Sequence, residues 1–179
     1  MWRRFLGAAA MLVLLSGGVV AAEYALTGSN TTVTFIGTKP DGKHDGGFKK
    51  VTGAANVPDD DLTKLKIEVE IDTTSLYSDN PKLTNHLKSP DFFGVKTNPT
   101  AKFVSSRVEK DGNDYRITGD LTLLGKTKAI TFPAQISIKD GTLNLTSKFT
   151  IDRTQWGMTY GQGKVDNEVT LGVKIAAKK

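Results

Sequence analysis

Residues 65–71 read Leu-Lys-Ile-Glu-Val-Glu-Ile, and this stretch decides the fold class. Its apolar side chains fall at every second position, with Lys66, Glu68 and Glu70 between them. Successive side chains of a β-strand point to opposite faces, so a period of two indicates a strand with one face buried and the other in water. The stretch therefore predicts a β-strand at the surface of a core.

The same alternation recurs on both sides of this segment, while helical periodicity is almost absent. Clear examples are Val33 with Phe35, the run from Tyr115 to Leu123, the run from Ile130 to Ile138, and the run from Val169 to Ile175. Turn residues separate the runs, as in Asp111-Gly112-Asn113, Asp140-Gly141 and Gly161-Gln162-Gly163. We predict an all-β fold: a lipocalin-like, antiparallel barrel of about eight strands, a size that encloses room for one small ligand.

One helical insertion interrupts the strands between Thr73 and Gly94. Asn80-Pro81 is a typical start of a helix, and Leu83 and Leu87 fall four residues apart on one face. Phe92 and Phe93 follow on the next turn. We expect a short helix near the mouth of the barrel, either as a lid or as an ordinary plug of core.

The first 22 residues have the pattern of a secretory signal peptide. Arg3 and Arg4 precede an apolar run from Phe5 to Leu15, and small residues follow as far as Ala22. A membrane anchor is the alternative, but the apolar run is shorter than the ~20 residues that span a bilayer. We expect cleavage after Ala22, export to the periplasm, and one domain at 23–179.

Composition excludes several classes of function. The chain has no cysteine, which rules out disulfides, lipoprotein acylation and thiolate sites. Only two histidines are present, so a histidine-rich metal centre is not expected. The formal charge of +5 is spread along the chain, so nucleic-acid binding is not expected.

Five distinctive motifs follow one another along the chain. They read G-T-K-P-D-G-K-H-D-G-G-F at 37–48, T-N-H-L-K-S-P-D-F-F-G at 84–94, P-T-A-K-F-V-S-S at 99–106, G-D-L-T-L-L-G-K-T-K-A-I-T-F-P at 119–133, and W-G-M-T-Y at 156–160. These motifs resemble those of the YceI-like family of periplasmic lipid-binding proteins, and the similarity extends from about Tyr24 to Ala177. It implies an extended barrel with a long apolar channel that holds an isoprenoid chain or a similar lipid, and family members are typically periplasmic and often dimeric.

Large apolar residues on the inward faces and in the insertion are the candidate contacts of such a lipid. From the residues alone they form either a filled core or a channel, and the resemblance favours a channel. The candidates are Phe35, Phe48, Ile67, Val69, Phe92, Phe93, Phe103, Leu121, Phe132, Phe149, Trp156, Met158 and Tyr160.

Polar residues beside the expected mouth are the candidates for contact with a head group: Lys43, His44, His86, Lys88 and Arg153. Each has an ordinary alternative role, as a solvated lysine or a histidine that braces a loop. The expected cargo is a polyprenyl phosphate, a quinone or a fatty amide, and no cofactor is required. Transient contact with a membrane and a homodimer are both compatible with this role.

Two other functions compete with lipid binding. A hydrolase could use Ser75, His86 and Asp91, although no nucleophile elbow, metal motif or phosphate-binding loop accompanies them. A stress-related structural protein would instead have a solidly packed barrel without cargo. We expect a binding protein and not an enzyme.

Overall fold

The computed structural model describes residues 21–179. The predicted leader at 1–22 lies outside the described residues, except for Ala21 and Ala22. The strands are β1 (Ala21–Thr27), β2 (Thr31–Lys39), β3 (Gly42–Phe48), β4 (Val51–Pro58), β5 (Lys66–Asp72), β6 (Leu76–Ser78), β7 (Thr100–Asp111), β8 (Asp114–Leu123), β9 (Lys126–Lys139), β10 (Thr142–Asp152) and β11 (Glu168–Lys178). One α-helix, α1 (Pro81–Lys88), and three short 3₁₀-helices, η1 (Leu62–Lys64), η2 (Thr73–Ser75) and η3 (Arg153–Trp156), complete this part of the chain.

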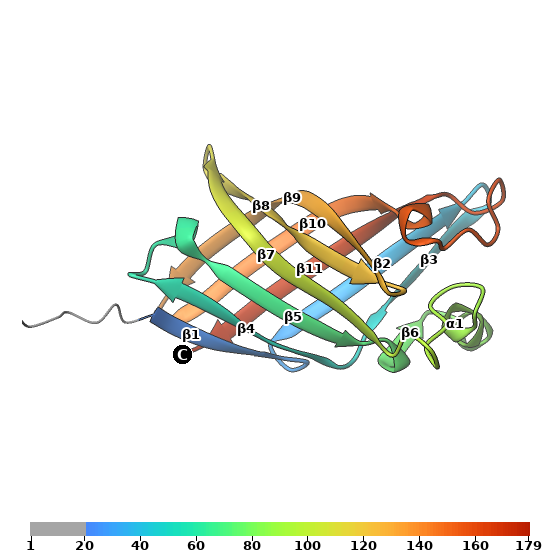
Figure 1. Cartoon of the computed structure of the whole chain (residues 1–179), viewed down its shortest axis with the longest axis horizontal. Helices are drawn as coiled ribbons and strands as arrows, with labels where there is room; N and C mark the ends of the chain where they lie inside the picture. The colour runs from blue at the N-terminus through green and yellow to red at the C-terminus, as the bar shows by residue number, and fades with distance from the viewer. Residues whose placement is uncertain (1–20) are drawn as a thin grey trace, which may run out of the picture.

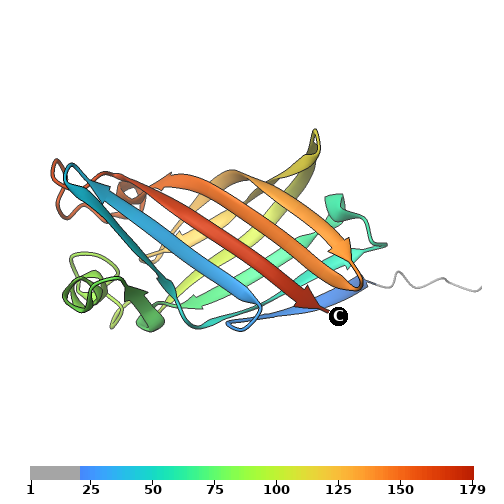
Figure 2. The same cartoon turned by 180° about the vertical axis from the view of Figure 1, so that it is seen from behind.

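All strands belong to one antiparallel sheet with the order β1-β4-β5-β7-β8-β9-β10-β11-β2-β3-β6. The sheet curls around one interior, as the two opposite views show (Figures 1 and 2). At the turn between β1 and β2, the backbone N–H of Ala176 in β11 donates to the carbonyl oxygen of Asn30 at 2.8 Å. The predicted all-β, antiparallel fold of lipocalin type with one short helix is confirmed.

The structure has eleven strands in place of the eight expected. Residues 28–30 separate β1 from β2. β1 pairs with β4, and β2 pairs with β3. β3 and β4 are likewise separated by Lys49 and Lys50, and β5 and β6 by η2. Gly28 approaches the segment between β3 and β4 so closely that an added Cβ would lie 2.6 Å from the carbonyl oxygen of Lys49. Kinks of this kind divide strands that alternation alone presents as continuous.

The helix α1 lies at one end of the curled sheet (Figure 1). Asn80 caps it, since its Oδ1 accepts from the N–H groups of Lys82 (2.8 Å) and Leu83 (3.2 Å), and Pro81 occupies the first turn. None of the helices in residues 21–179 has the length and apolar composition needed to cross a membrane.

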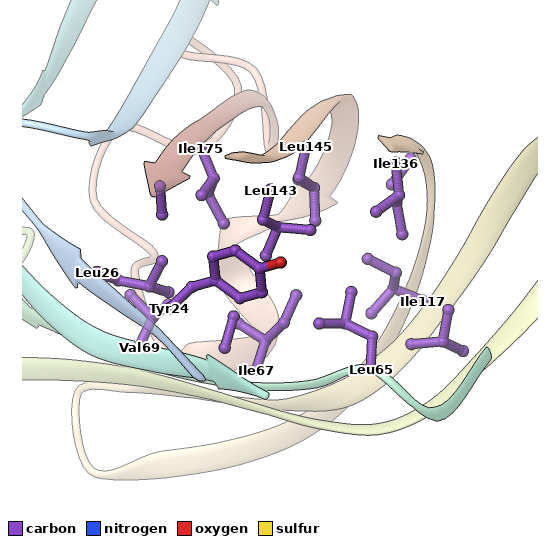
Figure 3. Close-up of a cluster of buried hydrophobic side chains, with 14 of the residues drawn as sticks. Tyr24, Leu26, Leu65, Ile67, Val69, Ile117, Ile136, Leu143, Leu145 and Ile175 are labelled. Atoms are coloured by element: carbon purple, nitrogen blue, oxygen red, sulfur yellow. The ribbon is translucent and has the colours of Figure 1, made fainter. Parts of the chain in front are cut away.

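The end of the sheet that carries β1 is filled with apolar side chains. Tyr24, Leu26, Leu65, Ile117 and Leu143 are at most 1% exposed and belong to one cluster. Figure 3 shows the ring of Tyr24 among these aliphatic side chains, with its hydroxyl pointing into the cluster. This hydroxyl has no hydrogen-bond partner among the described residues, and an unpaired buried hydroxyl costs free energy.

Three aspartates begin the three 3₁₀-helices in the same way. Each carboxylate accepts from the backbone N–H and the hydroxyl of the threonine two residues later, and these hydrogen bonds lower the pKa of all three carboxyls. The pairs are Asp61 with Thr63, Asp72 with Thr74, and Asp152 with Thr154.

Replacing Tyr24 with Phe should raise the free energy of unfolding by about 1 kcal/mol, because the unpaired hydroxyl is removed while the ring is kept. As a matched control, Leu26→Ala in the same strand should lower it by about 2–5 kcal/mol. Urea unfolding measures both. A Phe variant less stable than the wild type would show that the hydroxyl is paired in solution.

Replacing Asp61, Asp72 and Asp152 together with Asn should flatten the acid dependence of stability. Their pKa values are lower in the folded chain than in the unfolded chain, so the stabilisation is present above about pH 4 and is lost as pH falls through the folded pKa values. Asn caps helices as well as Asp does, but it does not titrate. Urea unfolding at several pH values checks this, and equal slopes below about pH 4 would contradict it.

Candidate ligand channel

A cavity of about 230 Å³ lies inside the curled sheet. Residues along the whole of β2, from Thr31 to Lys39, form part of its wall. A strand rises about 3.3 Å per residue, so this wall extends for about 26 Å. A cavity of about 150 Å³ already accepts benzene, so the volume found in this protein is sufficient for a ligand. Because that volume is spread along the length of β2, the cavity is narrow. We call this cavity the channel.

The wall of the channel is almost entirely apolar. It is built from the inward residues of β2, β3, β5 and β7–β11, together with residues of the α1 region. The predicted lipid contacts found on it are Phe35, Phe48, Ile67, Val69, Phe92, Phe93, Phe103, Leu121, Phe132, Phe149 and Met158. Of the polar and charged residues on the wall, none is an aspartate or a glutamate.

Phenylalanines form two groups along the wall. Phe132 stacks on Phe149 with ring centroids 4.2 Å apart and contacts Phe103 at 5.5 Å. Nearer to α1, Phe48 lies between Phe35 (5.9 Å) and Phe93 (5.6 Å). Rings on β2, β3, β7, β9 and β10, together with Phe93 after α1, therefore present apolar surface to any ligand.

Residues 81–94, which we call the lid, cover the end of the channel opposite β1. Leu83, Leu87, Phe92 and Phe93 lie on the channel wall. Leu87 and Phe92 also pack with Phe35, Leu76 and Met158 in one buried cluster, so the segment both borders the cavity and fills core at this end. The last turn of the lid bends at Gly94, which has a φ of +50°.

His86 and Tyr160 join the outside of the lid to the loop that follows η3. The His86 ring lies 4.8 Å from that of Tyr160 and 5.1 Å from that of Phe92, and His86 Nε2 is 2.8 Å from Asp91 Oδ2. Tyr160 is 48% exposed and is not on the channel wall, contrary to expectation. The ring of Tyr160 contacts the lid from outside the channel.

Trp156 also lies outside the channel, although the sequence suggested a place on the wall. Its indole N–H donates to the carbonyl oxygen of Leu121 at 3.0 Å, and the side chain is 1% exposed. Gly157 follows with a φ of +91°, which turns the chain sharply at the end of η3. Trp156 therefore braces η3 against β8.

Of the five predicted head-group residues, His44 and Arg153 are on the wall. Lys43, His86 and Lys88 are not. Lys43 pairs with Asp45 at 3.3 Å, and His44 Nδ1 is 3.0 Å from Asp79 Oδ1. We call the part of the wall formed by Thr38, Lys39, His44 and Arg153 the mouth.

Thr38 and Lys39 belong to the mouth but were not among the predicted residues. The signal for Lys39 was present, because the alternation that places Phe35 inward reaches Gly37 and then Lys39. The prediction names only Val33 and Phe35 on this strand and stops short of Lys39. In the structure β2 continues to Lys39.

Arg153 is buried, with only 3% of its surface exposed. Its guanidinium donates to the carbonyl oxygens of Asp166 (3.0 Å), Tyr160 (2.9 Å), Val165 (3.3 Å) and Met158. Burial lowers the pKa of Arg153 from its ordinary value, opposed by the charge of Asp152. The side chain therefore holds the loop after η3 in place and still reaches the channel wall.

Of the three residues of the hypothetical hydrolase site, two come together, because His86 Nε2 lies 2.8 Å from Asp91 Oδ2. Ser75 is engaged elsewhere: its hydroxyl donates to the carbonyl oxygen of Asp72 (2.6 Å) and accepts from the N–H groups of Lys49 and Lys50. Within residues 21–179 there is also no cluster of three or more potential metal ligands of the His, Cys, Asp or Glu type.

Comparisons with known sequences identify the family. The model described as "YceI-like domain" matches residues 24–177. Protein YceI of Escherichia coli O17:K52:H18 (strain UMN026 / ExPEC) is 36% identical over 130 residues, which are 71% of this chain and 68% of that protein. The UPF0312 protein Ent638_1570 of Enterobacter sp. (strain 638) is 36% identical over 140 residues, 76% of this chain and 73% of that protein.

Solved structures show the same fold. The crystal structure of Burkholderia cenocepacia BcnA matches with a TM-score of 0.77 at 24% identity, covering 83% of this chain and 96% of that one. A polyisoprenoid binding domain from Saccharophagus degradans, implicated in plant cell wall breakdown, matches with a TM-score of 0.70 at 12% identity, covering 89% and 99%. With the family model spanning nearly all of the described residues, the chain belongs to the YceI-like family.

Proposed function

We propose that this protein is a periplasmic binding protein that sequesters or carries a single-chain amphiphile, a long isoprenoid or a similar lipid, in its channel. The observation that carries the proposal is the long, narrow and apolar cavity inside the sheet. The leader expected at 1–22 supports the periplasmic location, because a signal peptide directs export of the chain across the inner membrane.

The width and length of the channel favour one extended chain. Each buried methylene contributes ~0.8 kcal/mol, so ten of them supply roughly 8 kcal/mol before the cost of ordering the chain. This corresponds to an affinity of about 1 μM. Binding of this strength needs few directional contacts, and chains of similar width are expected to compete for the site.

The relatives support the same class of ligand. The Saccharophagus degradans domain of the same fold is described as binding polyisoprenoid. For this chain we propose a polyisoprenoid or a lipid of similar shape, with polyprenyl phosphates, quinones and fatty amides as candidates. A lipid of this kind resides in a membrane, so the proposal includes transient contact with one, but it does not require a homodimer.

Val173→Trp provides the test. Val173 lies on the channel wall in β11, whereas Thr170 in the same strand lies on the opposite face. We expect the wild type purified from periplasm to release a long-chain lipid on organic extraction, detected by mass spectrometry. Val173→Trp should weaken binding of added polyprenyl lipid at least about tenfold, since several methylenes lose their place. Thr170→Trp should bind as the wild type does.

Thermal unfolding provides the second readout. Ligand at about 100 times its Kd should stabilise the wild type and Thr170→Trp by about 2.7 kcal/mol, with little effect on Val173→Trp. If no lipid is extracted and polyprenyl lipids leave the melting temperature of the delipidated protein unchanged, the proposed function is wrong.

A further inference from the structure

We propose that the mouth of the channel selects an anionic head group, a carboxylate or a phosphate, through Arg153 and Lys39. This inference rests on the proposed function and names the class of amphiphile that the channel takes. It favours lipid acids and lipid phosphates over quinones, alcohols and fatty amides.

The first observation is a buried positive charge without an acidic partner. No carboxylate forms an ion pair with Arg153 in the described part of the chain. The neighbouring acid, Asp152, accepts from the N–H and hydroxyl of Thr154 instead. Four of the five guanidinium N–H groups donate to backbone carbonyls, which satisfies them but leaves the net charge uncompensated.

The cost of removing this guanidinium from water is met when the protein folds. A charge that is already desolvated and fixed in position interacts more strongly with an incoming anion than a solvated one does. Because Arg153 forms part of the channel wall, the head group of a lipid in the mouth comes within the field of this charge.

The second observation is the sign of the charged groups on the channel wall. Lys39 and Arg153 carry full positive charges there, His44 is the third basic group, and the wall contains no aspartate or glutamate. Among the described residues Lys39 forms no ion pair. Two acids lie beside the mouth but not on the channel wall: Asp79 pairs with His44, and Asp166 accepts from the hydroxyl of Thr38 at 2.6 Å and keeps its negative charge.

The ammonium group of Lys39 and the one remaining N–H of Arg153 determine which head groups fit. Lysine and arginine side chains donate hydrogen bonds and accept none, so the head group must supply acceptors. A carboxylate or phosphate supplies several and forms charge-assisted hydrogen bonds, which are about twice as strong as neutral ones. A quinone or alcohol accepts only neutral hydrogen bonds, and an amide also brings donors that these two residues cannot accept.

A series of ligands with one tail tests this in the unmodified protein. Dodecanoate, dodecyl phosphate, dodecanol and dodecanamide share the chain and differ only at the head, and isothermal titration calorimetry with delipidated protein at neutral pH gives each Kd. We expect the acid, the phosphate or both to bind at least about tenfold tighter than the alcohol and the amide. The tighter of the two anions identifies the better head group.

Lys39→Gln is the matching variant, because Lys39 is exposed and removing its charge should leave the fold intact. It should weaken binding of the preferred anion about three- to tenfold and leave dodecanol unchanged. Lys139→Gln removes a lysine charge from the far end of β9 and should change neither the affinity for the preferred anion nor that for dodecanol. Arg153 is left intact because it also holds the loop after η3.

The outcomes separate this inference from the proposed function. If dodecanol or dodecanamide binds as tightly as both anions, or if Lys139→Gln weakens the anion as much as Lys39→Gln does, the anionic mouth is wrong while lipid binding stands. If none of the four chains binds and polyprenyl lipid also fails to stabilise the protein, the proposed function itself fails.

Discussion

A single sheet with one apolar face must bury that face, and this constraint governs the whole structure. Residues 21–179 contain no layer of helices for the purpose, since α1 has only eight residues and lies at one end of the sheet. The sheet buries its apolar face by curling until it packs against itself. Every inward residue then points into one shared interior, and whether this interior is filled or open depends on the side chains along it.

The two ends of the interior differ because the residues that reach it differ. Near β1, Tyr24 and Leu26 pack against Leu143 and Ile117, and the space is filled. Farther along, the lid covers the end of the sheet and phenylalanines line the wall, but they leave a continuous space between them. At the mouth the wall changes from apolar to basic. A filled base, an apolar tube and a basic mouth match the parts of an amphiphile in order, with the chain inside and the head near the opening.

Much of this arrangement could be predicted from local sequence. Strand alternation places Phe35, Phe103 and Phe132 inward, and Asn80-Pro81 marks the start of the only α-helix in the described residues. The positions of Trp156 and Tyr160 could not be predicted, because their contacts with Leu121 and His86 depend on how segments distant in the sequence pack together. The strand count failed for a related reason: the break at Gly28 depends on its close approach to the segment between β3 and β4. Nor can alternation tell whether side chains meet across the interior, since that depends on the volumes of residues from many strands.

The central claim is that the interior beyond the Tyr24 cluster is an open apolar tube. Xenon enters apolar cavities without needing a specific contact, so a crystal of the delipidated protein under xenon pressure tests the claim most directly. The account predicts xenon density inside the sheet beside Phe132, Leu145 and Val173, with these side chains unmoved. A crystal structure without xenon there, in which side chains from opposite walls touch along the length of the interior, would contradict it.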